Sequence, residues 1–279
     1  MKKLYNNILP LAIGFYFNVV AIFSKEGVAQ KAFTLFCTPR KGKVLKVQSS
    51  FLEAAKHDVV TVGGKQLQTY CWPGKKETVL LIHGWESNSF RWRNLIGLLQ
   101  DEGYEIIAFD APAHGNSSGS ILNVPLYAEC TQHVIQRFNP NSIVGHSVGG
   151  MTAVYHQYLY PNSTVQKIVT VGSPSELHDI MLQYKKILGF NNRVLGALDD
   201  YFKKHFGFGI HGFSTANFAK NITIPGLLIH DELDTIAPVK ASEKVHASWK
   251  NSTLIKTSGL GHSMHQSAVS EQIINFLKS

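Results

Sequence analysis

The chain has 279 residues, of which 44% are hydrophobic and 16% charged, and it contains 16 Phe, 10 Tyr and 4 Trp. A chain so rich in large apolar side chains can offset the entropy lost on folding, which excludes general disorder, and its length suits one α/β core. No Gly-X-Y period, heptad run or longer repeat occurs, which excludes collagen, coiled coils and solenoids. The three cysteines are too widely spaced to indicate a disulfide framework or a zinc site.

The net charge of +8 is concentrated at the beginning of the chain. Residues 1–46 hold eight Lys and Arg against a single acid, Glu26, so this segment alone carries +7. The remaining 233 residues are therefore nearly neutral, with a net charge of +1. A nucleic-acid-binding domain needs a basic face on its folded body. We accordingly expect no nucleic-acid partner.

An apolar run, ILPLAIGFYFNVVAIF, occupies residues 8–23, and Asn18 is its only strongly polar member. As a helix it would reach about 24 Å, which is short of the roughly 30 Å hydrocarbon core of a bilayer. Three interpretations stay open. The segment covers apolar surface on the folded body, or residues 4–46 contact a membrane, or Lys2, Lys3 and the apolar run form a cleaved signal peptide.

A second helix is predicted over residues 26–36, where apolar residues recur at roughly helical spacing before Pro39. The basic cluster Arg40–Lys46 follows, and an apolar helix next to a basic cluster suits an anionic lipid surface. We take residues 1–49 as an N-terminal segment and residues 50–279 as the main domain. We expect a cytoplasmic protein, with membrane association through the N-terminal helix left open.

From residue 58 onward, short apolar runs alternate with helix-length segments. Strands are predicted at 58–62, 66–72, 78–82, 105–109, 142–144, 167–171, 226–230 and 253–256, the first two joined as a hairpin by Gly63-Gly64. Helices are predicted at 94–102, 126–138, 151–160, 240–249 and 269–277. This alternation indicates an α/β fold with a mostly parallel central sheet flanked by helices and an antiparallel hairpin at its edge.

Residues 175–220 interrupt the alternation, because they contain no strand signal and many aromatic residues and glycines. We interpret this region as a helical insertion that forms a lid over the carboxyl ends of the strands. The alternative is an ordinary pair of surface helices.

The pentapeptide Gly145-His146-Ser147-Val148-Gly149 matches the pattern G-x-S-x-G and lies between a predicted strand and a predicted helix. A sharp strand–turn–helix exposes the serine hydroxyl above the sheet beside the positive helix N-terminus, and glycines remove side chains that would clash there. The alternative is a glycine-rich turn with an idle serine. The context favours a nucleophile.

A serine nucleophile needs a base, and that base must be oriented by an acid. His262 stands in a glycine-rich loop after the last predicted strand, and Asp231, Glu232 and Asp234 follow the strand before it. The chain order Ser, Asp, His is that of α/β-hydrolases and differs from the chymotrypsin and subtilisin orders. His265 is a weaker candidate for the base because no glycine precedes it.

With His83-Gly84-Trp85 after one strand and the segment 110–117 after the next, the chain from residue 58 resembles the lidded α/β-hydrolases with a serine nucleophile, such as esterases and lipases. The resemblance implies that Ser147 is the nucleophile and His262 is the general base and then acid. It also implies that Asp234 orients His262, and that the backbone N–H groups of Trp85 and Val148 form the oxyanion hole.

The family pattern places its acid four residues before a proline, which favours Asp234 over Asp231 and Glu232. Ala113 replaces the glycine common at that place in the family, a departure that affects loop shape. We expect hydrogen-bonding roles for His83 and His146 and structural roles for Asp110 and His114. His230 with the nearby aspartates is not expected to bind a metal, and the absence of GxGxxG and Walker motifs predicts no nucleotide cofactor.

The expected reaction is hydrolysis of an ester-like acyl bond in a small hydrophobic substrate through an acyl-serine intermediate. The aromatic insertion is taken to suggest a hydrophobic acyl group. Thioesters, lactones and the carbon–carbon bond of some diketones stay open, because the same three residues serve them. A ligand-binding or receptor-like module with little turnover and an acyltransferase are the alternative functions.

Overall fold

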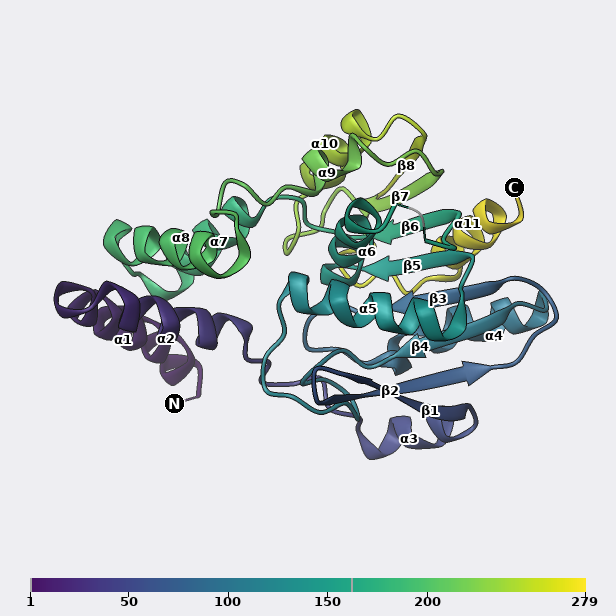
Figure 1. Cartoon of the computed structure of the whole chain (residues 1–279), viewed down its shortest axis with the longest axis horizontal. Coiled ribbons are helices and arrows are strands. Elements are labelled where there is room, and N and C mark those ends of the chain that lie inside the picture. Colours follow the sequence, from purple (N-terminus) through teal and green to yellow (C-terminus); the bar gives the residue numbers. More distant parts are fainter. Residues whose placement is uncertain (1, 162) are drawn as a thin grey trace. The chain divides into compact units, whose positions relative to one another are not determined.

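The computed structural model describes residues 2–161 and 163–279, with residues 2–7 described by their helical backbone alone. Contacts divide the chain into two compact units. Met1–Thr38 and Glu176–Ser214 form one, here called the helical unit, and Pro39–Ser175 and Thr215–Ser279 form the other, the sheet unit. Figure 1 shows the elements of each.

The sheet unit contains an eight-stranded sheet in the order β1-β2-β4-β3-β5-β6-β7-β8. The strands are β1 (Lys56–Val62), β2 (Lys65–Trp72), β3 (Thr78–Ile82), β4 (Glu105–Phe109), β5 (Ser142–His146), β6 (Lys167–Val171), β7 (Gly226–Asp231) and β8 (Ser252–Thr257). β2 is antiparallel to both β1 and β4, and all other pairs are parallel. The predicted sheet, including its antiparallel edge hairpin, is confirmed.

The helices of the sheet unit lie before, between and after its strands along the chain. They are α3 (Lys46–Glu53), α4 (Arg93–Asp101) after a short 3-10 helix (Ser89–Trp92), α5 (Val124–Phe138), α6 (Val148–Leu159), α9 (Thr215–Ala219), α10 (Lys240–Ser248) and α11 (Ser267–Lys278). The prediction missed α3, which begins at the last residue of the basic cluster. α6 begins three residues earlier than expected, directly after Ser147.

The core of the sheet unit lies on both faces of the sheet. Every residue of β3 is buried, and its side chains alternate between two apolar clusters. Leu80 and Ile82 pack with residues of α5 and α6, whereas Val79 and Leu81 pack with residues of α4 and α11. Figure 1 shows the sheet between these two helical layers. A strand covered on both faces reads as a continuous apolar run, which is why the strands were predictable.

The helical unit consists of α1 (Lys2–Phe23), α2 (Lys25–Cys37), α7 (Leu177–Leu188) and α8 (Asn192–Phe206). α1 contacts the other three helices, and α2 packs along α8. Its interior is aromatic: the ring of Phe33 lies 5.0 Å from that of Tyr201 and 5.7 Å from those of Phe202 and Phe206. The aromatic residues of the predicted insertion therefore build the core of this unit together with α2.

One face of α1 is held closely by α7 and α8. Phe17 and Ala21 are buried. The Asn18 side chain accepts a hydrogen bond from the Asn191 N–H at 2.7 Å and donates one to the Gly189 carbonyl at 3.5 Å, at the turn between α7 and α8. Within the described part of the chain, no helix has both the length and the apolar character to cross a bilayer.

The contact between α1 and α7 predicts a specific effect of substituting Gly14. A Cβ at this position would lie 1.7 Å from the Leu188 carbonyl oxygen, a backbone atom that cannot turn away. We expect Gly14→Ala to destabilise the helical unit by about 1–3 kcal/mol, the usual range for overpacking. Hydrogen exchange should show lost protection in α1 and α7.

Gly196→Ala is the matched control, because Gly196 also lies inside a helix of this unit but its added Cβ would meet nothing within 4 Å. Alanine is favoured over glycine in a helix by roughly 0.5–1 kcal/mol, so this variant should keep or gain protection. Equal protection in the two variants would contradict the close backbone contact.

Candidate active site

Ser147 occupies a strained turn between β5 and α6. Its backbone has φ 52° and ψ −122°, a combination that residues with a side chain rarely adopt. The chain passes so tightly here that a Cβ on Gly145 would lie 2.5 Å from the Gly149 carbonyl oxygen, and a Cβ on Gly149 would lie 2.3 Å from that of Ile82. The two glycines of the pentapeptide are therefore required by contacts between backbones.

The structure brings Ser147, His262 and Asp234 together in one hydrogen-bonded series. His262 Nε2 lies 3.0 Å from Ser147 Oγ, and His262 Nδ1 lies 2.7 Å from Asp234 Oδ2. Ser147 and Asp234 are buried, and the imidazole between them is partly exposed. An imidazole that donates from Nδ1 to a carboxylate has its Nε2 lone pair available for the serine proton.

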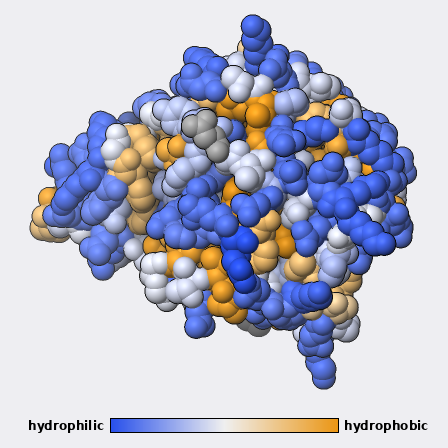
Figure 2. Space-filling model, turned by 45° about the vertical axis from the view of Figure 1, so that its right-hand side comes forward, coloured by the Kyte–Doolittle hydropathy of each residue, from blue (hydrophilic) through white to orange (hydrophobic). Residues whose placement is uncertain are grey.

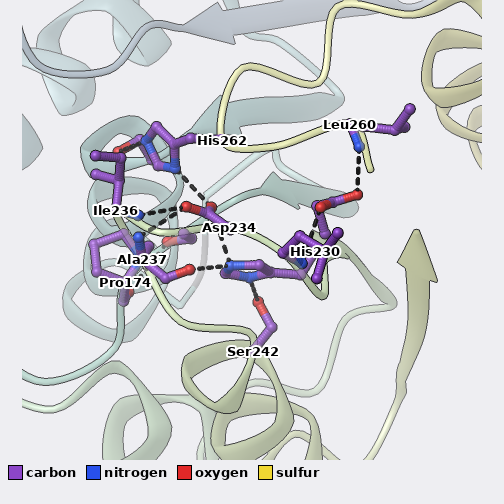
Figure 3. A network of polar contacts seen from close by, with 12 residues as sticks. Pro174, His230, Asp234, Ile236, Ala237, Ser242, Leu260 and His262 are labelled. Atoms are coloured by element: carbon purple, nitrogen blue, oxygen red, sulfur yellow. Dashed lines mark hydrogen bonds and ion pairs between the residues drawn. The ribbon is translucent and has the colours of Figure 1, made fainter. Parts of the chain in front are cut away.

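Asp234 is held in place by the turn that follows β7. Its Oδ1 accepts hydrogen bonds from the N–H groups of Ile236 at 2.8 Å and Ala237 at 3.0 Å, which leaves Oδ2 to face His262 (Figure 3). His230 lies beneath this turn. It donates from Nε2 to the Ala237 carbonyl at 2.7 Å, and its Nδ1 lies 2.6 Å from the Ser242 hydroxyl. Burial lowers the pKa of His230, so this imidazole supports the turn in its neutral form.

Asp231 has a different set of partners. Its Oδ2 accepts from the Thr257 hydroxyl at 2.9 Å and from the Leu260 N–H at 2.8 Å, and its Oδ1 accepts from the Leu233 N–H at 3.0 Å. The side chain thus fixes the start of the loop that carries His262 instead of facing the imidazole. Of the three acids considered from the sequence, Asp234 is the one hydrogen-bonded to His262.

His146 connects the serine turn to the histidine loop. Its Nε2 donates to the His262 carbonyl oxygen at 2.9 Å, so the residue before the serine holds the backbone of the histidine. Burial lowers the pKa of His146 well below its usual value, and the neighbouring Arg91 charge acts in the same direction. The ring is therefore a neutral donor, which agrees with the hydrogen-bonding role expected for it.

His83 and His114 link the loops that follow β3 and β4. His83 donates from Nδ1 to the Gly84 carbonyl at 2.7 Å and accepts at Nε2 from the Ala111 N–H at 2.9 Å. His114 accepts at Nε2 from the Glu86 N–H at 3.0 Å. Burial lowers the pKa of His83 to about 4 and also lowers that of His114. Both imidazoles shape the loops and lie outside the series that contains Ser147.

Asp110 is a buried carboxylate whose contacts are structural. It accepts from the N–H and hydroxyl of Ser89, each at 2.8 Å, from the Tyr70 hydroxyl at 2.9 Å and from the Asn116 N–H at 2.8 Å. In the same loop Ala113 has φ 66°, in the left-handed region that favours glycine. The loop thus keeps the backbone of a glycine position although alanine occupies it.

The loop containing Trp85 runs directly against the serine turn. A Cβ on Gly84 would lie 3.1 Å from the Cβ of Ser147. Val148 is the first residue of α6, so its N–H group has no carbonyl partner within that helix. Across residues 8–161 and 163–279 the backbone N–H groups of Trp85 and Val148 donate to no other group. Two such donors beside a serine can bind a negatively charged oxygen.

Sequence reasoning missed Arg91. Its Nη2 donates to the Ser263 carbonyl at 2.9 Å, and its guanidinium lies 4.9 Å from the centre of the Trp92 ring. Burial lowers the pKa of Arg91 to about 9. Arg91 thereby holds the residue after His262. No motif or residue spacing in the sequence indicates this role of Arg91.

Burial and the charges of Arg91 and Arg93 lower the pKa of His265 to about 4, and His265 lies outside the Ser147 series.

Comparisons with known proteins concern the fold and the class of protein. Residues 77–194 match the family model of the alpha/beta hydrolase fold. A bifunctional esterase/perhydrolase of Acinetobacter calcoaceticus is 25% identical over 274 residues, which cover 79% of this chain and 99% of the relative. A serine hydrolase-like protein of Danio rerio is 31% identical over 140 residues, 46% of this chain and 42% of the relative, so the match spans less than half of that protein.

Solved structures show the same fold. An esterase from Exiguobacterium antarcticum superimposes with a TM-score of 0.64 at 18% identity, over 80% of this chain and 100% of the other. At this identity the likeness concerns the arrangement of strands and helices.

The strained backbone predicts that glycine at position 147 stabilises the fold. Both Ser147→Ala and Ser147→Gly remove the hydroxyl, but only glycine adopts φ 52° and ψ −122° without strain. We expect the glycine variant to be more stable than the alanine variant by about 1 kcal/mol, since such strain costs roughly 1–3 kcal/mol. Thermal and urea unfolding of the two variants would measure this, and a more stable alanine variant would contradict it.

Proposed function

Because the chain belongs to the α/β-hydrolase fold family and is a hydrolase, we propose that it cleaves an ester-like acyl bond through an acyl-serine intermediate. The observation that carries the proposal is the series Ser147–His262–Asp234, with hydrogen bonds of 3.0 and 2.7 Å. The ester class is supported by the relative from Acinetobacter calcoaceticus, which is named as an esterase and matches over 99% of its length.

In the first half of the proposed reaction Ser147 attacks the substrate carbonyl. Its Oγ forms the new bond to carbon while its proton passes to His262 Nε2, and Asp234 stabilises the resulting imidazolium through Nδ1–H. The carbonyl oxygen becomes an oxyanion, for which the N–H groups of Trp85 and Val148 are the proposed donors. When the tetrahedral intermediate collapses, His262 gives its proton to the leaving alkoxide, and an alcohol departs.

Water releases the acyl group in the second half. His262, neutral again, removes a proton from water as the water oxygen attacks the acyl-serine carbonyl. The second tetrahedral intermediate then breaks its bond to Ser147 Oγ, which recovers the proton from His262. The products are the free carboxylic acid and the original enzyme, so no other reactant is consumed.

The substrate is proposed to be apolar near the reacting bond. Leu233 and Ile236, on either side of Asp234, are large apolar side chains that stay exposed on the sheet unit. In Figure 3 Ile236 lies beside Asp234, close to His262. An apolar acyl or alcohol group would cover such side chains and remove their surface from water. The aromatic residues of the insertion instead pack against Phe33 of α2 within the helical unit.

An activated serine should react with a fluorophosphonate. The expected result is one covalent adduct on the wild type, formed as Ser147 Oγ displaces fluoride from phosphorus, and no adduct on Ser147→Ala. Intact-mass spectrometry with the same incubation of both proteins would detect it. An adduct that persists on Ser147→Ala would assign the reactive serine elsewhere. No adduct on folded wild type would favour a binding module with little turnover.

The two aspartates after β7 provide a matched pair of variants. Asp234→Asn should lower kcat for p-nitrophenyl esters by about 10⁴-fold, the loss in kcat seen when the orienting acid of a serine protease is replaced by asparagine. Asp231→Asn should retain much more activity but lose about 1–3 kcal/mol of stability, because an amide NH₂ would face donors that now bond to a carboxylate.

Rates measured with esters of increasing acyl length would give the loss of activity of each variant. Urea unfolding of both variants would give the change in the free energy of unfolding. A larger activity loss in Asp231→Asn than in Asp234→Asn would reverse the assignment of the acid. Product analysis with an added alcohol would show a transesterified product if the enzyme is an acyltransferase.

A further inference from the structure

The outer face of α1 is apolar, although it is exposed. Large hydrophobic side chains on this helix keep much of their surface accessible: Ile8 55%, Leu11 55%, Phe15 70%, Tyr16 48%, Ile22 62% and Phe23 83%. Exposed apolar side chains that occur singly are normal, but a continuous group on one element marks a surface that contacts a partner or a membrane. Figure 2 shows one face of the molecule, on which apolar areas, in orange, lie among hydrophilic residues.

These residues form a stripe because of their spacing. Positions 8, 11, 15, 19 and 22 are three or four residues apart and therefore lie along one side of the helix. The other side contains Gly14, Phe17 and Ala21, which pack within the helical unit. α1 is thus a helix that is apolar on both sides, with one side buried in protein and the other exposed.

The charges around the stripe favour an anionic surface. Residues 1–25 contain Lys2, Lys3 and Lys25 and no acidic residue. The segments Met1–Thr38 and Glu176–Ser214, which form the helical unit, together contain nine Lys and Arg against five Asp and Glu. An apolar helical face flanked by lysines has the composition of helices that lie in the interface of anionic bilayers.

We propose that the face of α1 formed by Ile8, Leu11, Phe15, Val19 and Ile22 binds the surface of an anionic bilayer with the helix axis in the membrane plane. The apolar side chains enter the boundary between headgroups and acyl chains, and the lysines contact lipid phosphates. Residues 8–23 lie within the segment 4–46, whose apolar run and basic cluster are compatible with membrane contact. The proposal does not rest on the proposed hydrolase activity.

The contacts of α1 argue against a helix that spans the bilayer. Asn18 bonds with the turn between α7 and α8, and the helix backbone at Gly14 lies against that of Leu188. A spanning helix would have to break these contacts and expose Asn18 to lipid. A second copy of the chain is also disfavoured as the partner, because pairing two α1 stripes would bring like charges together.

Binding to vesicles of stated composition tests the proposal. Wild-type protein should co-sediment with vesicles of phosphatidylcholine and phosphatidylglycerol, bind vesicles of phosphatidylcholine alone much less, and dissociate as salt is raised. The double variant Phe15→Gln, Ile22→Gln should bind the anionic vesicles with an affinity lower by about tenfold or more, since membrane affinity follows the buried apolar area.

The matched control is Val59→Gln, Leu159→Gln, which removes two exposed apolar side chains from the sheet unit, where they are 50% and 41% exposed. This control should bind like the wild type. Circular dichroism would establish that both double variants are folded. The proposal is overturned if the wild type does not bind, or if both double variants bind equally.

Two further measurements separate the alternatives. The variants Phe15→Trp and Ile22→Trp should be quenched to the same extent by lipids brominated at a given depth if the helix lies flat, whereas a spanning helix would place position 15 near the bilayer centre and position 22 about 10 Å away from it. A wild-type dimer that the α1 variant converts to monomer, without vesicle binding, would assign the face to a second copy. Ser147→Ala should bind vesicles like the wild type, so failure of the hydrolase proposal and failure of this one are distinguishable.

Discussion

The close passage of three backbone segments at Ser147 is the constraint on which the site depends. The turn after β5 brings Gly149, the second residue of α6, against the end of β3, and it leaves no room for a Cβ at Gly145 or Gly149. The same crowding forces Ser147 into a strained backbone conformation and holds the Gly84 loop against it. The hydroxyl therefore stands at the carboxyl edge of the sheet, where loops from β3, β7 and β8 can reach it.

The position of His262 depends on two aspartates three residues apart that have different hydrogen-bond partners. Asp234 uses one oxygen to hold its own turn and the other to orient the His262 ring, whereas Asp231 binds the backbone of the loop that carries the histidine. His146 and Arg91 hold the carbonyl groups of His262 and Ser263. The imidazole is thus fixed through its ring and its backbone by groups from three segments of the chain: the end of β5, the 3-10 helix Ser89–Trp92 and the turn that ends β7.

Features with a local physical signature could be predicted from sequence. Strands covered on both faces appear as apolar runs, Gly63-Gly64 marks the hairpin, and the order of serine, acid and histidine follows from loop chemistry. Features that depend on distant contacts could not. α3 is short and lies beside a basic cluster, and Arg91 acts through the backbone of a residue 172 positions away. Likewise, the sequence suggests that the aromatic residues of 175–220 reflect the character of the substrate, whereas in the structure Phe33 of α2 packs among them.

The first helix shows why average hydropathy is a poor guide to such segments. Residues 8–23 read as a marginal bilayer span because the apolar content is high on every side of the helix and one asparagine interrupts it. The asparagine is explained by its hydrogen bonds to the turn between α7 and α8, some 170 residues away. Once that side of the helix is assigned to protein contact, the apolar residues on the opposite side no longer serve the fold. Their exposure then requires a separate physical reason, and a surface outside the chain is the one that removes them from water.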